Sequence, residues 1–123
     1  MKAQELLKKI ANEHAAELCE PGDSVSDKSL KKGSSYQNLA IEGGNAYSVV
    51  RAAAITAGTV IMDEKEEGQL AALLKGGVGK LAPVLLVAVV EDNQVALGCY
   101  SKEGLIPQHA AEKTLKSFVT AIS

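Results

Sequence analysis

The chain has 123 residues, which fits a single domain over residues 1–123. Hydrophobic residues make up 46% of it, so we expect a packed core, and that core must be aliphatic because there is no Trp and one Phe. The net charge of −2 lacks the basic excess that nucleic-acid binding or membrane-surface binding requires. The longest apolar run is far shorter than the ~20 residues of a membrane span, and the first residues show no signal-peptide pattern. We therefore expect a cytoplasmic protein.

The two cysteines, Cys19 and Cys99, lie far apart in the sequence. A pair of buried free thiols in a reducing cytosol is favoured over a disulfide, which stays the alternative.

Residues 2–18 form the first predicted element, an amphipathic helix ended by Pro21-Gly22. We expect His14 to pack beside its apolar face rather than to act as a ligand or base. The helix over residues 2–18 places five residues along one face: Leu7, Ile10, Ala11, His14 and Leu18.

Residues 20–35 follow as a polar connection and a candidate partner-contact loop.

The segment from Tyr36 to Met62 mixes helix and strand signals. Residues 38–42 alternate like a half-buried strand, and Gly43-Gly44-Asn45 is a turn. In residues 46–57 the alanines favour helix, while Val, Ile and Tyr favour strand. We favour a strand over Tyr47–Val50 because a glycine turn links it to the preceding strand, with a buried helix over 46–57 as the alternative. Residues 59–62 are another short strand candidate.

The acidic run Asp63–Glu67 lacks the alternating acids and central glycine of a calcium loop, so we predict a solvated turn or helix start and no metal site. Residues 69–75 are predicted to be a short helix on propensity, ended by Gly76. The glycines of residues 76–80 lack the first glycine and the Ser or Thr of a phosphate loop, and we expect no bound cofactor.

The last third of the chain determines the fold class. Residues 84–90 are apolar at seven consecutive positions and predict an interior strand covered on both faces. Asp92-Asn93 suits a tight turn into a second strand over 94–100, and a helix opens near Pro107. We predict a small α/β (α+β) domain with a mainly antiparallel sheet flanked by N- and C-terminal helices. In the predicted strand over 94–100, Val95, Leu97 and Cys99 share one face. Ala96, Gly98 and Tyr100 share the opposite face. The terminal helix buries Ala111, Leu115, Phe118, Val119 and Ile122.

Residues 98–103, followed by Pro107 before an amphipathic helix, resemble the last strand and helix entry of profilins. Gln94 and residues 57–59 are also similar to profilin positions. The resemblance implies a profilin-like fold and the binding of monomeric actin through the terminal helix and neighbouring strands. Residues 2–18 carry no aromatic side chain, so we predict weak or absent polyproline binding. The matching surface would comprise Lys80, Tyr100, Gln108, His109, Lys113 and Lys116.

The same order of elements is similar to that of roadblock and longin adaptors. In that alternative the chain is a homodimeric adaptor or scaffold that pairs through an edge strand or the Ala-rich residues 46–57. A third hypothesis is an enzyme or small-ligand sensor in which Cys99 and His109 form a nucleophile–base pair. Cys99 lies in a predicted core strand, where thiols are usually inert. We therefore predict a non-enzymatic protein-binding module with no catalytic residues.

Overall fold

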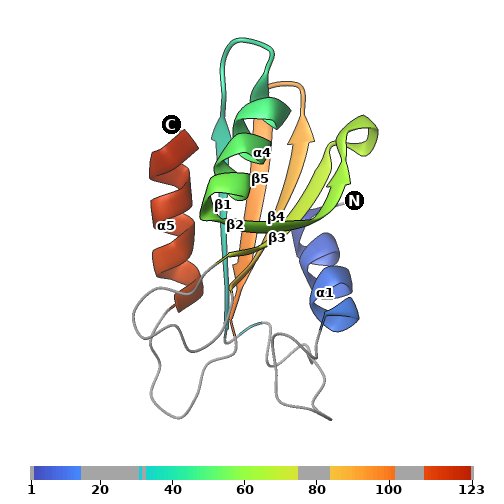
Figure 1. Cartoon of the computed structure of the whole chain (residues 1–123), viewed down its shortest axis with the longest axis vertical. Coiled ribbons are helices and arrows are strands. Elements are labelled where there is room, and N and C mark those ends of the chain that lie inside the picture. Colours follow the sequence, from blue (N-terminus) through green and yellow to red (C-terminus); the bar gives the residue numbers. More distant parts are fainter. Residues whose placement is uncertain (1, 15–30, 32, 75–83, 102–109, 123) are drawn as a thin grey trace.

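The computed structural model describes residues 2–14, 31, 33–74, 84–101 and 110–122. In this part of the chain, one five-stranded sheet carries helices on both of its faces (Figure 1). This confirms the predicted class, a small α/β domain with an antiparallel sheet and a helix at each end. The elements are α1 (Ala3–Glu13), β1 (Ser34–Ala40), α4 (Ala46–Ala57), β2 (Gly58–Glu64), η1 (Lys65–Glu67), β3 (Gln69–Leu74), β4 (Val84–Glu91), β5 (Gln94–Tyr100) and α5 (Ala110–Ile122).

The sheet has the strand order β1-β5-β4-β3-β2, and every neighbouring pair is antiparallel. β1 and β2 are therefore the two edges of the sheet. They run in the same direction, because four antiparallel steps separate them. A tight hairpin cannot join two such strands, and α4 carries the chain from one edge to the other across one face.

The predicted interior strand is the centre of this sheet. Side chains of β4 are buried on both sides: Val84, Leu86 and Ala88 belong to one core cluster, and Leu85 and Val87 to the other. The alternation of side chains along a strand produces this division. Asp92, in the turn to β5, has φ +54°, a conformation that Asp adopts more readily than most residues. The predicted hairpin is confirmed.

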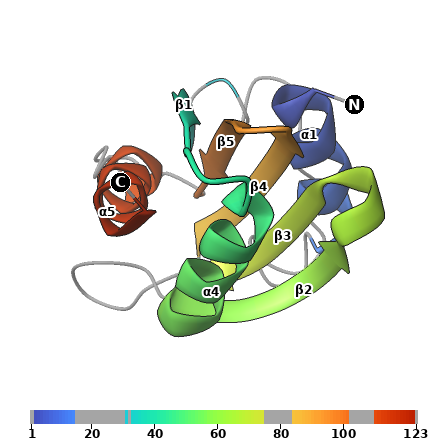
Figure 2. The same ribbon diagram turned by 90° about the horizontal axis from the view of Figure 1, so that it is seen from above.

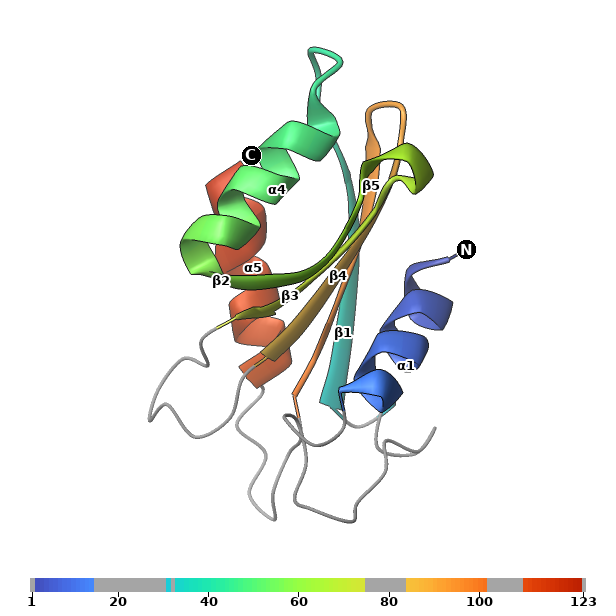
Figure 3. The same cartoon turned by 45° about the vertical axis from the view of Figure 1, so that its right-hand side comes forward.

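Helices cover the two faces unequally. On one face α4 lies against β2 and β3, and α5 lies against β1 and β5 (Figure 2). The opposite face carries α1, which packs on β4 and β5 through Leu6, Leu7, Ile10 and Ala11 (Figure 3). The two terminal helices are therefore on opposite faces of the sheet.

The preferred interpretation of Tyr47–Val50 as a strand is wrong, and the alternative helix over residues 46–57 is the observed one. The positive φ angles of Gly43 and Gly44 form the predicted turn, but they lead into a helix instead of a hairpin. Tyr47, Val50 and Ala54 are spaced three and four apart, so one helical face buries all three. Burial of this face outweighs the strand propensity of Tyr and Val.

The predicted helix over residues 69–75 is also wrong, because residues 69–74 form β3. Leu and Ala have high helix propensity, but this segment pairs with β2 on one side and β4 on the other. Leu70, Ala72 and Leu74 face α4 and α5, while Ala71 and Leu73 face α1. Pairing on both sides and burial on both faces override the local preference.

The remaining predicted elements are present in the described residues with shifted bounds; of the acidic run, Asp63 and Glu64 end β2, and residues 65–67 form the predicted helical turn. α1 begins at Ala3, ends at Glu13 and is followed by the half-buried His14, and the predicted continuation to Leu18 lies outside the described residues. The strand predicted over 38–42 begins earlier, at Ser34, and ends at Ala40. Residues 59–62 lie within β2. In α5 the predicted stripe is inward, with Ala111, Leu115, Phe118 and Ile122 buried and Val119 half-buried.

Candidate functional site

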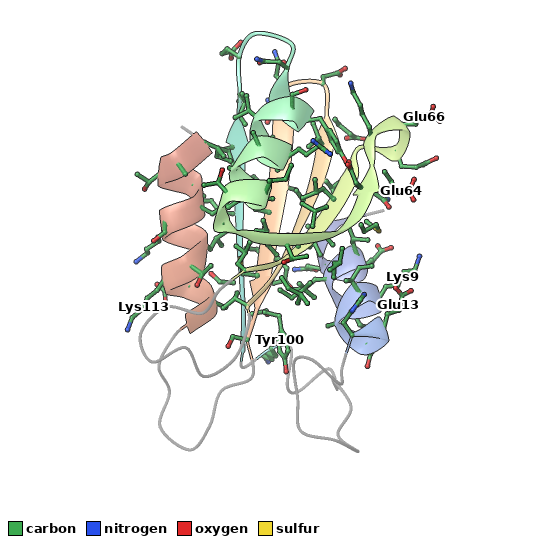
Figure 4. All side chains as sticks on the ribbon, in the orientation of Figure 1. Lys9, Glu13, Glu64, Glu66, Tyr100 and Lys113 are labelled. Carbon is green, nitrogen blue, oxygen red and sulfur yellow. The ribbon has the colours of Figure 1, made fainter. Side chains whose placement is uncertain are left out.

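Of the six residues predicted to contact a partner, the structure describes Tyr100, Lys113 and Lys116, and Tyr100 shares no surface with the two lysines. Lys113 and Lys116 are exposed on α5, and Lys113 points away from the sheet (Figure 4). Tyr100 is completely buried in the cluster beneath α1, so its assignment to a contact surface is wrong. The sequence placed Tyr100 on a strand face but could not show that α1 covers that face. Lys80, Gln108 and His109 lie outside the described residues.

Cys99, the candidate nucleophile, lies on β5 inside the core between the sheet and the α4 and α5 layer. Burial raises the pKa of this thiol to about 12, so the thiol is protonated at neutral pH. It is free of a disulfide, as predicted. His109 and Cys19 lie outside the described residues. A buried, protonated thiol offers a substrate neither access nor a nucleophile.

The most distinctive surface of the described chain combines α4 with the edge strand β2. β2 pairs with β3 on one side only, which leaves backbone donors and acceptors along its outer side. Beside it, Ile55 of α4 has half of its side chain exposed, at 50%. Val60, Ile61 and Met62 of β2 are half-buried. We call this combination, α4 with β2, the α4–β2 edge.

A charged network holds the two parts of the α4–β2 edge together. The Tyr47 hydroxyl donates to Asp63 Oδ1 at 2.5 Å, and Arg51 Nε donates to Asp63 Oδ2 at 2.6 Å. The Tyr47 oxygen also lies 3.1 Å from the carbonyl oxygen of Gln69. The hydrogen bonds from Tyr47 and then Arg51 lower the pKa of Asp63, while burial and the bond to Asp63 raise the pKa of Tyr47. The network fixes α4 relative to the end of β2.

Charge is unevenly distributed along β2. The strand begins with the uncharged residues Gly58 to Met62 and ends with Asp63 and Glu64. η1 adds Glu66 and Glu67, with Lys65 as its basic residue. Figure 4 shows Glu64 and Glu66 near the β2–β3 connection. The α4–β2 edge is thus apolar at one end and acidic at the other.

α4 also borders an apolar groove of about 760 Å³ that separates it from α5. Val49 and Ala53 of α4, Phe118 of α5 and Leu74 of β3 line this groove. The facing residues are mostly small, including Ala52, Ala57, Thr114, Ser117 and Ala121, so the two helices do not close the space between them. A partner that contacts α4 would have this groove beside it.

Among the described residues, no group of three or more His, Cys, Asp or Glu side chains is arranged to hold a metal ion. Within the same ranges, no helix has the length and apolar character needed to cross a bilayer.

Comparison with known proteins gives no relative for this chain. No family model, no curated protein and no solved structure matches it significantly.

Sequence reasoning did not identify Ile55 as a surface residue, because a strand over Tyr47–Val50 was favoured and the helix over residues 46–57 was only the alternative. Once these residues are a helix, Ile55 falls outside the face formed by Tyr47, Val50 and Ala54. An isolated isoleucine on the outer face of an Ala-rich helix is the signal that could have found it. The edge position of β2 depends on strand order, which no local pattern encodes.

Proposed function

We propose that the chain is a non-enzymatic protein-binding module that pairs with a second copy of itself through the α4–β2 edge. The observation that supports this most is the position of the Ala-rich helix beside an unpaired edge strand. From the sequence, an adaptor similar to the roadblock proteins was expected to pair through an unspecified edge strand or through residues 46–57, and the helix over these residues lies beside edge strand β2. We retain the prediction of a cytoplasmic protein.

The charge pattern favours an antiparallel arrangement of the two copies. In a symmetric pair centred on Ile61, the acidic residues Asp63 and Glu64 of one β2 lie opposite Thr59 and Gly58 of the other. Equivalent acids are then about 13 to 20 Å apart at the ~3.3 Å rise of a strand, beyond the ~8 Å screening length at physiological salt. A parallel pair would place them side by side. Antiparallel pairing therefore avoids the repulsion between the acidic ends.

The helical part of the edge adds apolar contact. Burying the exposed half of Ile55 contributes about 1 kcal/mol from each copy, since complete burial of such a side chain stabilises by roughly 1.5–3 kcal/mol. Ala52, an exposed residue of α4 that also lines the groove toward α5, is small enough to let a partner helix approach. The contacts of α4 and the pairing of β2 reinforce each other, because the Tyr47–Asp63–Arg51 network holds helix and strand as one surface.

A bulge interrupts β2 at the centre of the proposed pair. The register with β3 shifts between Val60 and Met62, so Ile61 is the extra residue. A bulge on an edge strand disrupts pairing with a further strand at that point. We therefore expect the two β2 strands to pair on either side of Ile61, and the helical part of the edge to supply the remaining contact.

Sedimentation equilibrium over a wide concentration range tests the proposal. We expect the mass to rise from one copy to two, and the Ile55→Glu variant to stay at one copy because it places two charges in the interface. Tyr36→Glu is the matched control: Tyr36 is the other large exposed hydrophobic residue of the described chain, at 39%, and lies on the opposite edge. A single-copy mass for the unmodified chain at high concentration would overturn the proposal.

Binding of monomeric actin is the second candidate, and the exposure of Lys113 and Lys116 on α5 supports it. Of these two, Lys116 forms an ion pair with Glu112 at 3.3 Å on the same exposed helix face. In a polymerisation assay, the chain should slow filament growth at micromolar concentration, and the double variant Lys113→Glu/Lys116→Glu should not. No effect of the unmodified chain would exclude this candidate. Weak or absent polyproline binding stays a prediction, supported by the position of α1 and α5 on opposite faces.

A further inference from the structure

α1 covers only part of its face of the sheet, and a hollow of about 800 Å³ lies beside its first turn. Side chains and backbone of three neighbouring strands form the floor: Tyr36 and Asn38 from β1, Ala96 from β5 and Val89 from β4. The register places Tyr36 opposite Gly98 and Asn38 opposite Ala96, so these positions belong to one face. The hollow therefore extends from edge strand β1 into the sheet.

Tyr36 is a preformed aromatic surface at the edge of this hollow. Its side chain is 39% exposed although the residue lies in the middle of a regular strand. A methyl group added at Gly98 would lie 3.0 Å from two carbons of the Tyr36 ring, so the ring rests against the Gly98 backbone. Glycine at this position leaves the room that the ring occupies. One side of the ring is thus supported while part of it stays accessible.

Three carboxylates surround the hollow: Glu5 of α1, Glu67 of η1 and Glu91 of β4. All three are exposed, and none forms a salt bridge or side-chain hydrogen bond with another described residue. Lys2 is the one basic residue among those lining the hollow. With three glutamates and one lysine, the lining carries a formal net charge of −2.

The adjoining strand β1 is an open and regular sheet edge. All seven of its residues pair with β5 without a bulge, from Ser34 opposite Tyr100 to Ala40 opposite Gln94. Its other side pairs with no described strand. In contrast to β2, β1 has no acidic residue, and its exposed residues are Tyr36, Gln37, Asn38 and Ala40. An extended peptide can add to such an edge through backbone hydrogen bonds.

We propose that β1 and the hollow bind an extended basic segment of a partner protein, which adds as a sixth strand beside β1. Alternate side chains of that segment face the hollow, at the two-residue period of a strand. An arginine there lies over the Tyr36 ring in a cation–π contact, and the carboxylates around the hollow attract the basic segment as a whole. This site is on the edge opposite the α4–β2 edge, so one chain can pair and bind the segment at the same time.

A labelled eight-residue peptide that alternates arginine and valine is the probe, with a glutamate–valine peptide as the comparison. We expect the basic peptide to bind and the acidic one not to bind, with affinity falling as salt is raised. Glu67→Gln and Glu91→Gln should each weaken binding about two- to fivefold, which is the range of single exposed ion pairs. Lys2→Gln should strengthen it by a similar factor. Glu66→Gln is the matched control, because Glu66 is the exposed neighbour of Glu67 and does not line the hollow, and it should leave the affinity unchanged.

Amide chemical shifts on peptide addition locate the site. The proposal predicts shifts in residues 34–40 and 94–97, and a loss of affinity of about fivefold or more in Tyr36→Leu that Tyr36→Phe largely avoids. Equal binding of both peptides, equal effects of Glu66→Gln and Glu67→Gln, or shifts confined to β2 would each overturn it. None of these results depends on the sedimentation mass, so this proposal and the pairing of two copies fail separately.

Discussion

Gly68, between η1 and β3, offers a test of the hairpin geometry that orients the acidic end of the α4–β2 edge. Its φ is +68°, and a Cβ at this position would overlap the carbonyl oxygen of Val90. Its own carbonyl accepts the Val90 amide at 2.7 Å. In Gly68→Ala, left-handed backbone costs about 1 kcal/mol. Displacing the strand and weakening this hydrogen bond costs about 2 kcal/mol more.

We therefore expect Gly68→Ala to lower the free energy of unfolding by about 3 kcal/mol, or the Tm by about 12 °C for a chain of this length. Gly44→Ala is the matched control, because Gly44 has a similar φ of +74° with no atom within 4 Å of an added Cβ. It carries the conformational cost alone, about 1 kcal/mol. Urea unfolding of both variants measures the difference. Equal losses in the two variants would refute the contact between Gly68 and Val90.

Three further predictions concern the core, the charged network and the thiol. Phe118→Ala removes a buried ring that packs α5 on the sheet, and should lower the free energy of unfolding, measured by urea unfolding, by about 3–5 kcal/mol. The control Thr120→Ala, at an exposed position of the same helix, should change it by less than about 1 kcal/mol. The lowered pKa of Asp63 means that its ionised form stabilises the fold above the ordinary carboxyl pKa, and this stabilisation is lost as the pH falls through the lowered value. Between pH 5 and pH 2, the free energy of unfolding of Asp63→Asn should therefore fall less than that of the unmodified chain. An identical pH profile for the two proteins would contradict the network. Cys99 should react with iodoacetamide only as fast as the chain unfolds, and rapid alkylation in the native state would show that the thiol is accessible.

The parts of the fold that the sequence predicted are those in which local pattern and final burial agree. The apolar run of β4 and the stripe of α5 show their burial directly, and Asp92 indicates the turn through its tolerance of positive φ. Residues 47–50, favoured as a strand, and residues 69–75, predicted as a helix, were misassigned because their residue types suit the other structure. In both, contacts with segments distant in the sequence decide the outcome: α4 packs on β2 and β3, and β3 is held between two strands.

The candidate surfaces were less predictable than the core. Tyr100 alternates correctly along its strand, yet whether its face meets a helix or solvent depends on where α1 packs. Ile55 and Tyr36, by contrast with Tyr100, are exposed because no described element covers them. Exposure of a strand face or edge depends on strand order and on helix placement, and neither can be predicted from a short local segment of sequence.

Hydrogen exchange of backbone amides at low and high protein concentration tests the central claim most directly. If two copies pair through the α4–β2 edge, amides of residues 58–64 exchange more slowly as concentration rises, while those of edge strand β1 do not change. β1 then becomes protected only when the arginine–valine peptide is added. Exchange in residues 58–64 that is independent of concentration, across a range in which the chain is fully soluble, would contradict the proposed pairing.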